Sequence, residues 1–344
     1  MHALRRRIAL VIAFLGLLSA TAYGAEKTDV VVLANGDHIT GEINSLQRGQ
    51  LQFKTDDAGT LYLEWDKLVS VVATTRVFDV STTDGRRFLG TLVMTGNRVL
   101  EVMTAIGNVM LPMLEVTALT PIGASFWSKL DGSVSAGYNY TKSSGIAQLN
   151  FNSDTVYRRP AFSARLTASL TQTDQENEEP DRRAYIEGSY VRFRSQNWFV
   201  VGQGRFETNE SLGIKLRSQG GFAYGPRLIN TNRQQMGIAG GIAVNDERGV
   251  DVEPVVNVEG LVLFQWSYFR YDSPKSNIDV SFQYYPSLSN AGRQRVQFDS
   301  TLKHEVLKDF TVSLNFYDSY DSRPPNTAFD TNDLGVVFSI GWTY

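Results

Sequence analysis

The chain has 344 residues, with 33 Lys and Arg, 36 Asp and Glu, and no cysteine. Without cysteine it holds no disulfide, no thiolate nucleophile and no cysteine-ligated metal. Its net charge of −3 argues against nucleic acid as a partner, because phosphate backbones select basic surfaces.

The chain begins with the features of a secretory signal peptide. Three consecutive arginines precede an apolar run from Ile8 to Leu18, and small residues follow this run. About 11 apolar residues are too few to cross a bilayer as a helix, which takes about 20. We therefore expect residues 1–25 to be removed on export, which leaves a mature net charge of about −6.

From Asp29 to Ile122 the sequence repeats itself with an offset of 49 residues. Asn35-Gly36 aligns with Asp84-Gly85, and Gly41 aligns with Gly90. Asn-Gly and Asp-Gly pairs predict type I′ hairpins, and a glycine inside a strand allows the sharp bend of a small barrel. The pattern resembles SH3-like or Sm-like barrels. We expect two tandem repeats, 29–75 and 76–122, of four to five strands each, as a packing or partner-binding module.

Beyond residue 122 the sequence loses helical periodicity and alternates to its end. Phe162, Leu166 and Leu170 fall on one face of a strand, with Arg165 and Thr167 on the other. Apolar residues toward lipid and polar residues toward a lumen are typical of membrane barrels. We predict an all-β fold with an antiparallel transmembrane barrel of about twelve strands in residues 129–344. The expected strands are 130–141, 147–158, 161–173, 183–194, 197–207, 215–225, 234–245, 255–270, 276–286, 294–305, 310–319 and 334–344.

The connections between these strands alternate between short turns and longer polar loops. Barrels of the outer membrane have short turns in the periplasm and long loops outside, so the repeats are expected to lie on the periplasmic side. The loop Asp174 to Asp181 is the most acidic connection, and we interpret it as a solvated outer loop rather than a calcium site.

Charged residues of both signs fall on the predicted inner face. A barrel of this size can have either a narrow pore or an interior filled by ion pairs, and the sequence leaves both open. The lumen candidates are Arg158, Arg165, Arg205, Glu207, Glu259, Asp279, Asp299, Lys303 and Glu305.

A catalytic role finds little support in the sequence. After export only His38 and His304 remain, and a lipid hydrolase would need a histidine to activate serine or water. Alternation places His304 on the lipid-facing side, and its nearest serine on the same face in sequence is Ser300. We therefore predict no catalytic residue, no metal ligand and no cofactor.

The last strand is the most membrane-like segment of the chain. Its apolar face carries Val336, Phe338, Ile340, Trp342 and Tyr344. The alternation of apolar residues with a period of two also fits a terminal strand of a soluble sandwich. However, a terminal strand that ends in aromatic residues is typical of the strand that closes an outer-membrane barrel. We expect the barrel-assembly machinery to recognise it.

Signal peptide, small-barrel repeats and a barrel ending in Gly341-Trp342-Thr343-Tyr344 together resemble the YdiY-type, salt-induced outer-membrane protein family of unknown function. The resemblance implies the outer membrane as the location, with lipid and lipopolysaccharide as surroundings. We expect a non-enzymatic structural or envelope-stress role with narrow passive permeability and a periplasmic protein partner. The alternatives are a small-solute or ion channel and, less favoured, an outer-membrane lipid hydrolase.

Overall fold

The structure is a computed structural model that describes residues 28–95, 98–122, 126, 130–141, 145–159, 161–175, 181–194, 197–210, 213–249, 252–324 and 331–342. The expected signal peptide, most of the acidic loop and Tyr344 lie outside these residues. The described chain is built almost entirely of β-strands. Among the described residues, no helix combines the length and apolarity that crossing a bilayer demands.

The amino-terminal repeats form a nine-stranded sheet. Its order is β4-β3-β2-β1-β5-β6-β7-β8, with β9 pairing to both β2 and β5. Its strands are β1 (Asp29–Leu33), β2 (His38–Gln47), β3 (Gln50–Lys54), β4 (Thr60–Glu64), β5 (Leu68–Thr82), β6 (Arg87–Thr95), β7 (Val99–Thr104), β8 (Gly107–Pro112) and β9 (Val116–Pro121), with 3₁₀ turns at Trp65–Lys67 and Met113–Glu115.

Strand β5 belongs to both repeats. Its first half pairs with β1, and its second half pairs with β9. The first half of β5 also reaches β6 of the second repeat, while β9 reaches β2 of the first through Leu46 and Leu119. The final strand of each repeat therefore pairs with a strand of the other repeat. The two expected barrels thus form one fused body, which we call the small domain.

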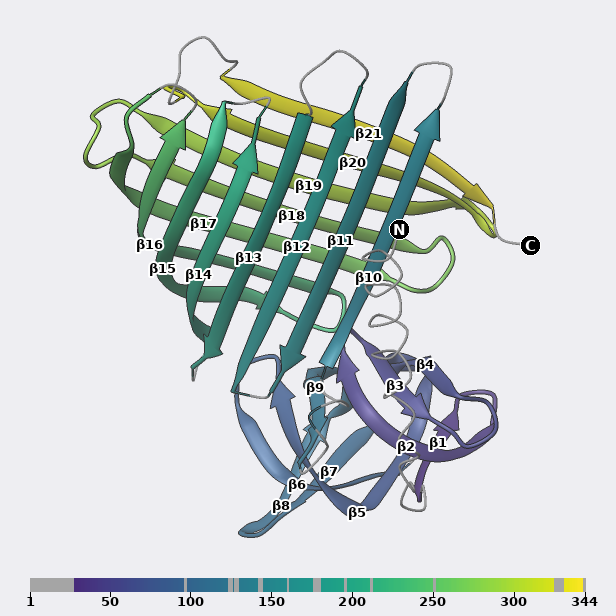
Figure 1. The fold of residues 1–344 in the computed structure, drawn as a ribbon. Helices are drawn as coiled ribbons and strands as arrows, with labels where there is room; N and C mark the ends of the chain where they lie inside the picture. Colours follow the sequence, from purple (N-terminus) through teal and green to yellow (C-terminus); the bar gives the residue numbers. More distant parts are fainter. Residues whose placement is uncertain are drawn as a thin grey trace, which may run out of the picture.

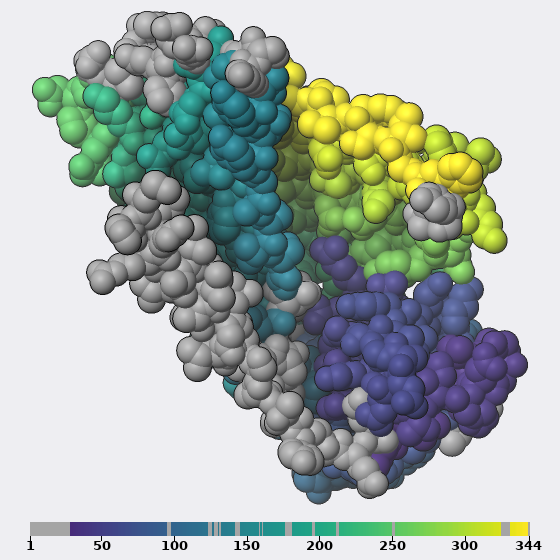
Figure 2. All heavy atoms as spheres, turned by 45° about the vertical axis from the view of Figure 1, so that its right-hand side comes forward, coloured from purple at the N-terminus to yellow at the C-terminus, as the bar shows by residue number. Residues whose placement is uncertain are grey.

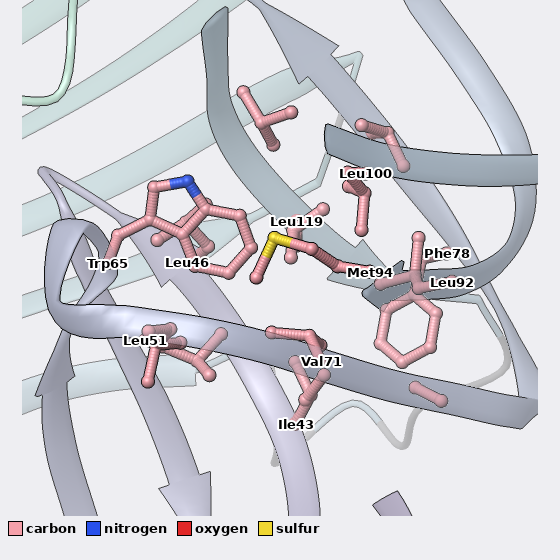
Figure 3. Packing of buried hydrophobic residues seen from close by; sticks show 14 of the residues in the cluster. Ile43, Leu46, Leu51, Trp65, Val71, Phe78, Leu92, Met94, Leu100 and Leu119 are labelled. Atoms are coloured by element: carbon pink, nitrogen blue, oxygen red, sulfur yellow. The ribbon is translucent and has the colours of Figure 1, made fainter. Parts of the chain in front are cut away.

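The small domain has a single hydrophobic core drawn from both repeats. Figure 3 shows Trp65 and Leu46 of the first repeat in one cluster with Met94, Leu100 and Leu119 of the second. Trp65 Nε1 donates a hydrogen bond to the Met113 carbonyl at 2.8 Å, which satisfies the one polar group of this buried side chain.

The two predicted hairpins are present, but their turn type is not I′. Only Gly36 (φ 91°) and Gly85 (φ 80°) have positive φ, whereas Asn35 and Asp84 do not. Leu33 and Asp37 close a three-residue loop, as Thr82 and Arg86 do. These are type I turns followed by a glycine bulge. Asn35 and Asp84 each accept the backbone N–H two residues on, which favours this turn.

Gly41 and Gly90 are required by close strand contact. A Cβ on Gly41 would lie 2.5 Å from Phe53 Cε1, and one on Gly90 would overlap the Met103 carbonyl oxygen. Both glycines thus let a bent strand approach its neighbour, as the aligned repeats predicted.

The rest of the chain forms a twelve-stranded antiparallel sheet in sequence order, which confirms the predicted strand count. Its strands are β10 (Leu130–Thr141), β11 (Ile146–Arg158), β12 (Phe162–Asp174), β13 (Asp181–Phe193), β14 (Trp198–Asn209), β15 (Ile214–Asn230), β16 (Gln234–Gly249), β17 (Val255–Arg270), β18 (Ser276–Pro286), β19 (Gln294–Leu307), β20 (Phe310–Asp321) and β21 (Asn332–Trp342).

Strand β15 continues five residues past its predicted end at Gly225. The prediction stopped before Pro226, which lacks a backbone donor. In the structure, a register shift between Arg227 and Ile229 absorbs the irregularity, and the strand runs on to contact the small domain.

The sheet curls into two walls that face each other, with the small domain at one end (Figure 1). The first wall begins at β10, and the other ends at β21. Among the described residues no ladder joins β10 to β21, and Figure 2 shows the molecule hollowed between these two walls. The barrel is therefore fully paired from β10 to β21 and open along the seam between them.

Side chains of this barrel are sorted with apolar groups outside. Leu166, Phe222 and Phe338 are 52%, 57% and 60% exposed, whereas the inward Glu259 and Asn245 are 0% exposed. This confirms the predicted alternation. In β13, whose parity the sequence left ambiguous, Ile186 and Tyr190 are the exposed residues.

The small domain is docked on the short turns of the barrel by asparagines. Asn197 Nδ2 donates to the Thr83 carbonyl at 2.7 Å, and Asn232 Nδ2 donates to the Val116 carbonyl at 2.9 Å. Asn230 reaches the Thr82 carbonyl at 3.3 Å. Because these bonds end on backbone carbonyls of strands and turns, they fix the domain at the barrel mouth.

Charged contacts surround these asparagines. Lys67 pairs with Asp272 at 2.9 Å, and Arg233 pairs with Asp66 at 3.1 Å. Arg48 pairs with Asp279 at 3.5 Å and lies over the Phe269 ring. Through these contacts the small domain covers the short-turn end of β15 to β18.

Candidate functional site: the charged interior of the barrel

Period-2 alternation directs a set of charged side chains into the space between the walls. Odd-numbered residues of β14 to β17 point inward, so Arg205, Glu207, Arg217, Glu247 and Glu259 come to neighbouring positions on one inner surface. Arg217, Glu247 and Glu259 are buried, and Arg205 and Glu207 are partly buried. Such charges are stable inside a protein only when they are paired.

Arg217 is the centre of this network. Its guanidinium lies 2.8 Å from Glu207, 2.8 Å from Glu247 and 3.6 Å from Asp321. Arg293 pairs with two of these three acids, at 2.7 Å from Glu247 and 2.6 Å from Asp321. Because Asp321 is the last residue of β20 and Glu247 lies two residues before the end of β16, the network ties the two walls together near the long-loop end.

Two further pairs extend the network along the interior. Arg295 forms a two-pronged contact with Glu259, with hydrogen bonds of 2.8 and 2.6 Å, and Arg205 contacts Glu187 at 2.9 Å and Glu207 at 2.6 Å. Aromatic rings cover the guanidinium faces, since Arg205 lies 4.1 Å from the Tyr185 ring centre and Arg295 4.8 Å from that of Tyr285. Ion pairing and cation–π contact together satisfy these buried charges.

The walls also touch through uncharged side chains. Gln203 Nε2 on β14 lies 3.3 Å from Gln283 Oε1 and 3.2 Å from the Tyr285 hydroxyl, both on β18. Toward the short-turn end, apolar residues including Ala223, Ala239 and Leu261 fill the space. This part of the interior is thus packed by side chains.

Three of the predicted lumen residues, Arg205, Glu207 and Glu259, lie in the network. Asp299 lies on the inner face between Ser281 and Tyr317 but has no ion pair among the described residues. Arg165 lies apart from the network on β12, 3.7 Å from Asp154, with both side chains about half exposed.

The remaining predicted lumen residues serve other contacts. Asp279 binds Arg48 of the small domain, and Lys303 is exposed beside Asn277 and Ser313. Glu305 caps two turns by accepting the Lys275 and Asp309 N–H groups at 2.9 and 3.2 Å. The side chain of Arg158 lies outside the described residues.

Sequence reasoning missed six of the nine residues of the network. Glu187, Arg217 and Arg295 share the inward parity of residues that were selected, so alternation could have found them. Glu247 and Asp321 fell in predicted loops, because β16 and β20 run four and two residues farther than their patterns show, and Arg293 lies in the connection just before β19. The missed members are Glu187, Arg217, Glu247, Arg293, Arg295 and Asp321.

His304 has a serine partner that its sequence neighbourhood did not reveal. The antiparallel register of β18 and β19 places Ser276 opposite His304, and Ser276 Oγ lies 2.8 Å from His304 Nδ1. Both residues are on the outer face. Among the described residues no carboxylate is bonded to the imidazole, and no three metal-binding side chains are grouped to hold an ion.

The terminal strand has the predicted outward face. Val336, Phe338, Ile340 and Trp342 are 58–71% exposed and pair in register with β20. Closure of the barrel by this strand stays a prediction, since its described residues pair only with β20.

Among solved structures, a bacterial polysaccharide outer membrane secretin is similar with a TM-score of 0.35 and 8% identity, over 78% of this chain and 97% of that one. No curated protein matches the chain. The family model described as a protein of unknown function, DUF481, matches residues 134–344, which is more than half of the chain and almost the whole barrel. The chain therefore belongs to the DUF481 family, the family of the YdiY-type proteins that its sequence resembles.

Proposed function

We propose that this protein is a non-enzymatic β-barrel of the outer membrane with a structural role in the envelope, including under envelope stress. The observation that carries the proposal is the inverted sorting of side chains, with Glu259 at 0% exposure inside and Trp342 at 71% exposure outside. A surface of this kind is stable against acyl chains rather than water.

In this proposal the short turns and the small domain face the periplasm, and the signal peptide brings the chain there. The β21 strand is the segment that the barrel-assembly machinery engages. The outer face contacts lipid and lipopolysaccharide, and the surface of the small domain away from the barrel is free for a periplasmic protein.

The first test is physical. The protein purified in detergent is expected to migrate faster on an unboiled gel than after boiling, because the paired barrel resists unfolding. A chain that stays monodisperse in buffer without detergent would contradict the proposal.

Filling of the interior supports a structural role over an open pore. Arg217 and Arg293 join both walls, and the small domain covers one mouth. In planar bilayers we expect little or no steady current from the wild type. Arg293→Gln, which leaves Glu247 and Asp321 with Arg217 as their remaining arginine partner, should raise the conductance, whereas Arg192→Gln on the outer face should leave it unchanged.

A narrow solute or ion channel is the second candidate, and one observation favours it. Along β11 and β12 the inward Asp154 and Arg165 are 45% and 52% exposed, so a wetted strip lies beside the packed interior. A large, steady wild-type current that falls in Arg165→Gln would favour this channel. A lipid hydrolase is not proposed, because no acid among the described residues is bonded to the Ser276 and His304 pair.

A further inference from the structure

We propose that Arg270, Ser276 and His304 form a binding site for the phosphodiester of a membrane glycerophospholipid. This inference rests on the proposed membrane location and adds a specific lipid site to it. We call these three residues the rim row. They lie in register on β17, β18 and β19, since Arg270 pairs with Ser276 and Ser276 pairs with His304.

The rim row lies on the outer face of the barrel. Its neighbours in sequence point inward, because Phe269 is 1% exposed against Arg48, and Ser267 and Asn277 bind Asp279 on the inner side. Directly opposite residues on adjacent strands have neighbouring side chains, so the row spans about 10 Å across three strands.

Apolar residues follow the rim row toward the centre of the barrel. The next outward positions are Tyr268, Ile278 and Leu302, again in register across the same strands. The row therefore marks the edge of the apolar band at the short-turn end. A phospholipid with acyl chains against Ile278 and Leu302 would have its phosphate at this edge.

Arg270 and His304 supply the donors for such a phosphate, while the Ser276 hydroxyl is bonded to His304 and, at 3.3 Å, to the Pro274 carbonyl. Arg270 has no ion pair among the described residues, in contrast to the interior Arg217, Arg293 and Arg295. The contact between Ser276 Oγ and His304 Nδ1 fixes the imidazole orientation and leaves Nε2 without a bond from the described residues. A guanidinium fork beside an oriented imidazole suits phosphate oxygens.

Native mass spectrometry of the full-length protein, released from detergent with added phosphatidylglycerol, tests the site. We expect Arg270→Gln to weaken retention of one bound lipid about tenfold, as loss of a charged hydrogen bond predicts. His304→Gln should weaken it less. Arg192→Gln is the matched control, because Arg192 is an exposed outward arginine near the same rim without a serine and histidine partner.

Equal lipid retention in the wild type, Arg270→Gln and His304→Gln would overturn the site, as would an equal loss in Arg192→Gln. Displacement of the lipid by millimolar inorganic phosphate would also overturn it, because the site would then recognise the free ion. Heat-modifiable migration of every variant separates this failure from failure of the membrane assignment, which would appear as a wild type that needs no detergent.

Discussion

The small domain and the barrel are built from the same kind of strand but sort side chains in opposite ways. In the small domain, Trp65, Phe53 and Phe78 are fully buried in an apolar core, and the buried Asp29 and Asp79 are each paired with a partly exposed arginine. In the barrel, Glu259 and Arg295 are buried and large apolar residues are exposed. Period-2 alternation therefore specifies two faces, and the surrounding medium determines which face becomes the interior.

The two interiors also differ in how they hold together. The small domain depends on apolar contact, so deletion of side-chain volume should cost most there. The barrel interior depends on paired charges, so removal of one partner should cost more than replacement of both. Each contrast can be tested by substitution.

The largest effect is expected for Trp65→Ala. Loss of the ring leaves a cavity in the shared core and removes the hydrogen bond to Met113, so the small domain should lose about 4 kcal/mol of stability. Pulse proteolysis of the full-length protein in urea measures this loss. Tyr62→Ala, at a side chain that is 64% exposed, should change little, and a comparable loss there would contradict the assigned core.

Glu259→Gln should have the next largest effect. It leaves the buried Arg295 guanidinium unpaired, at a cost of about 3 kcal/mol, and should lower the temperature at which the barrel loses its fast gel migration. The double variant Glu259→Leu with Arg295→Met should recover most of this loss. If the double variant is as unstable as the single one, the pair acts through packing and not through charge.

Asn232→Ala probes the junction of the two regions. It removes the hydrogen bond to the Val116 carbonyl, and we expect docking to weaken by about 1 kcal/mol. Since the chain has no cysteine, single cysteines introduced at Asp57 and Lys308 allow a spin-label distance measurement. The distance distribution should broaden in Asn232→Ala but not in Asn108→Ala, which alters an exposed residue bonded within the small domain.

The smallest effect concerns pH at the same junction. The hydrogen bond from Lys67 holds the pKa of Asp272 below its ordinary value. The Lys67–Asp272 pair therefore stabilises docking at pH values above the ordinary pKa of 3.8. This stabilisation is lost as the pH falls through the lowered pKa of Asp272. At neutral pH, Asp272→Asn should weaken docking by well under about 1 kcal/mol, because the pair is exposed. Acidification should broaden the spin-label distances more in the wild type than in this variant.

Much of the fold follows from the sequence because alternation is local. The twelve barrel strands and the aligned repeats could be placed from residue patterns alone. The end of β15 at Asn230 and the end of β16 at Gly249 could not be placed in this way. Contacts with the small domain stabilise the end of β15, and the ion pair between Arg293 and Glu247 stabilises the end of β16. The turn at Asn35-Gly36 also differed from the predicted type I′, because the dipeptide alone does not indicate which side-chain oxygen accepts a hydrogen bond from the backbone.

The candidate site was harder to predict than the fold. Inward parity identified Arg205, Glu207 and Glu259, but parity does not state which charges meet across the interior. The register between β18 and β19 brings Ser276 to His304 from 28 residues away. Such pairings depend on the register of neighbouring strands, and a shift of two residues changes the pairing while leaving every side chain on the same face.

The strand β5, which serves both halves of the small domain, limits how this module can exist outside the present chain. A polypeptide carrying the first copy alone would leave the first half of β5 without β6, Leu46 without Leu119 of β9, and half of the core open to water. It would have to obtain the missing strand from a second molecule, so we expect a solitary copy to assemble as a twofold dimer. If sedimentation showed that such a single-copy chain is a folded monomer, the strand from a second molecule would not be needed for folding.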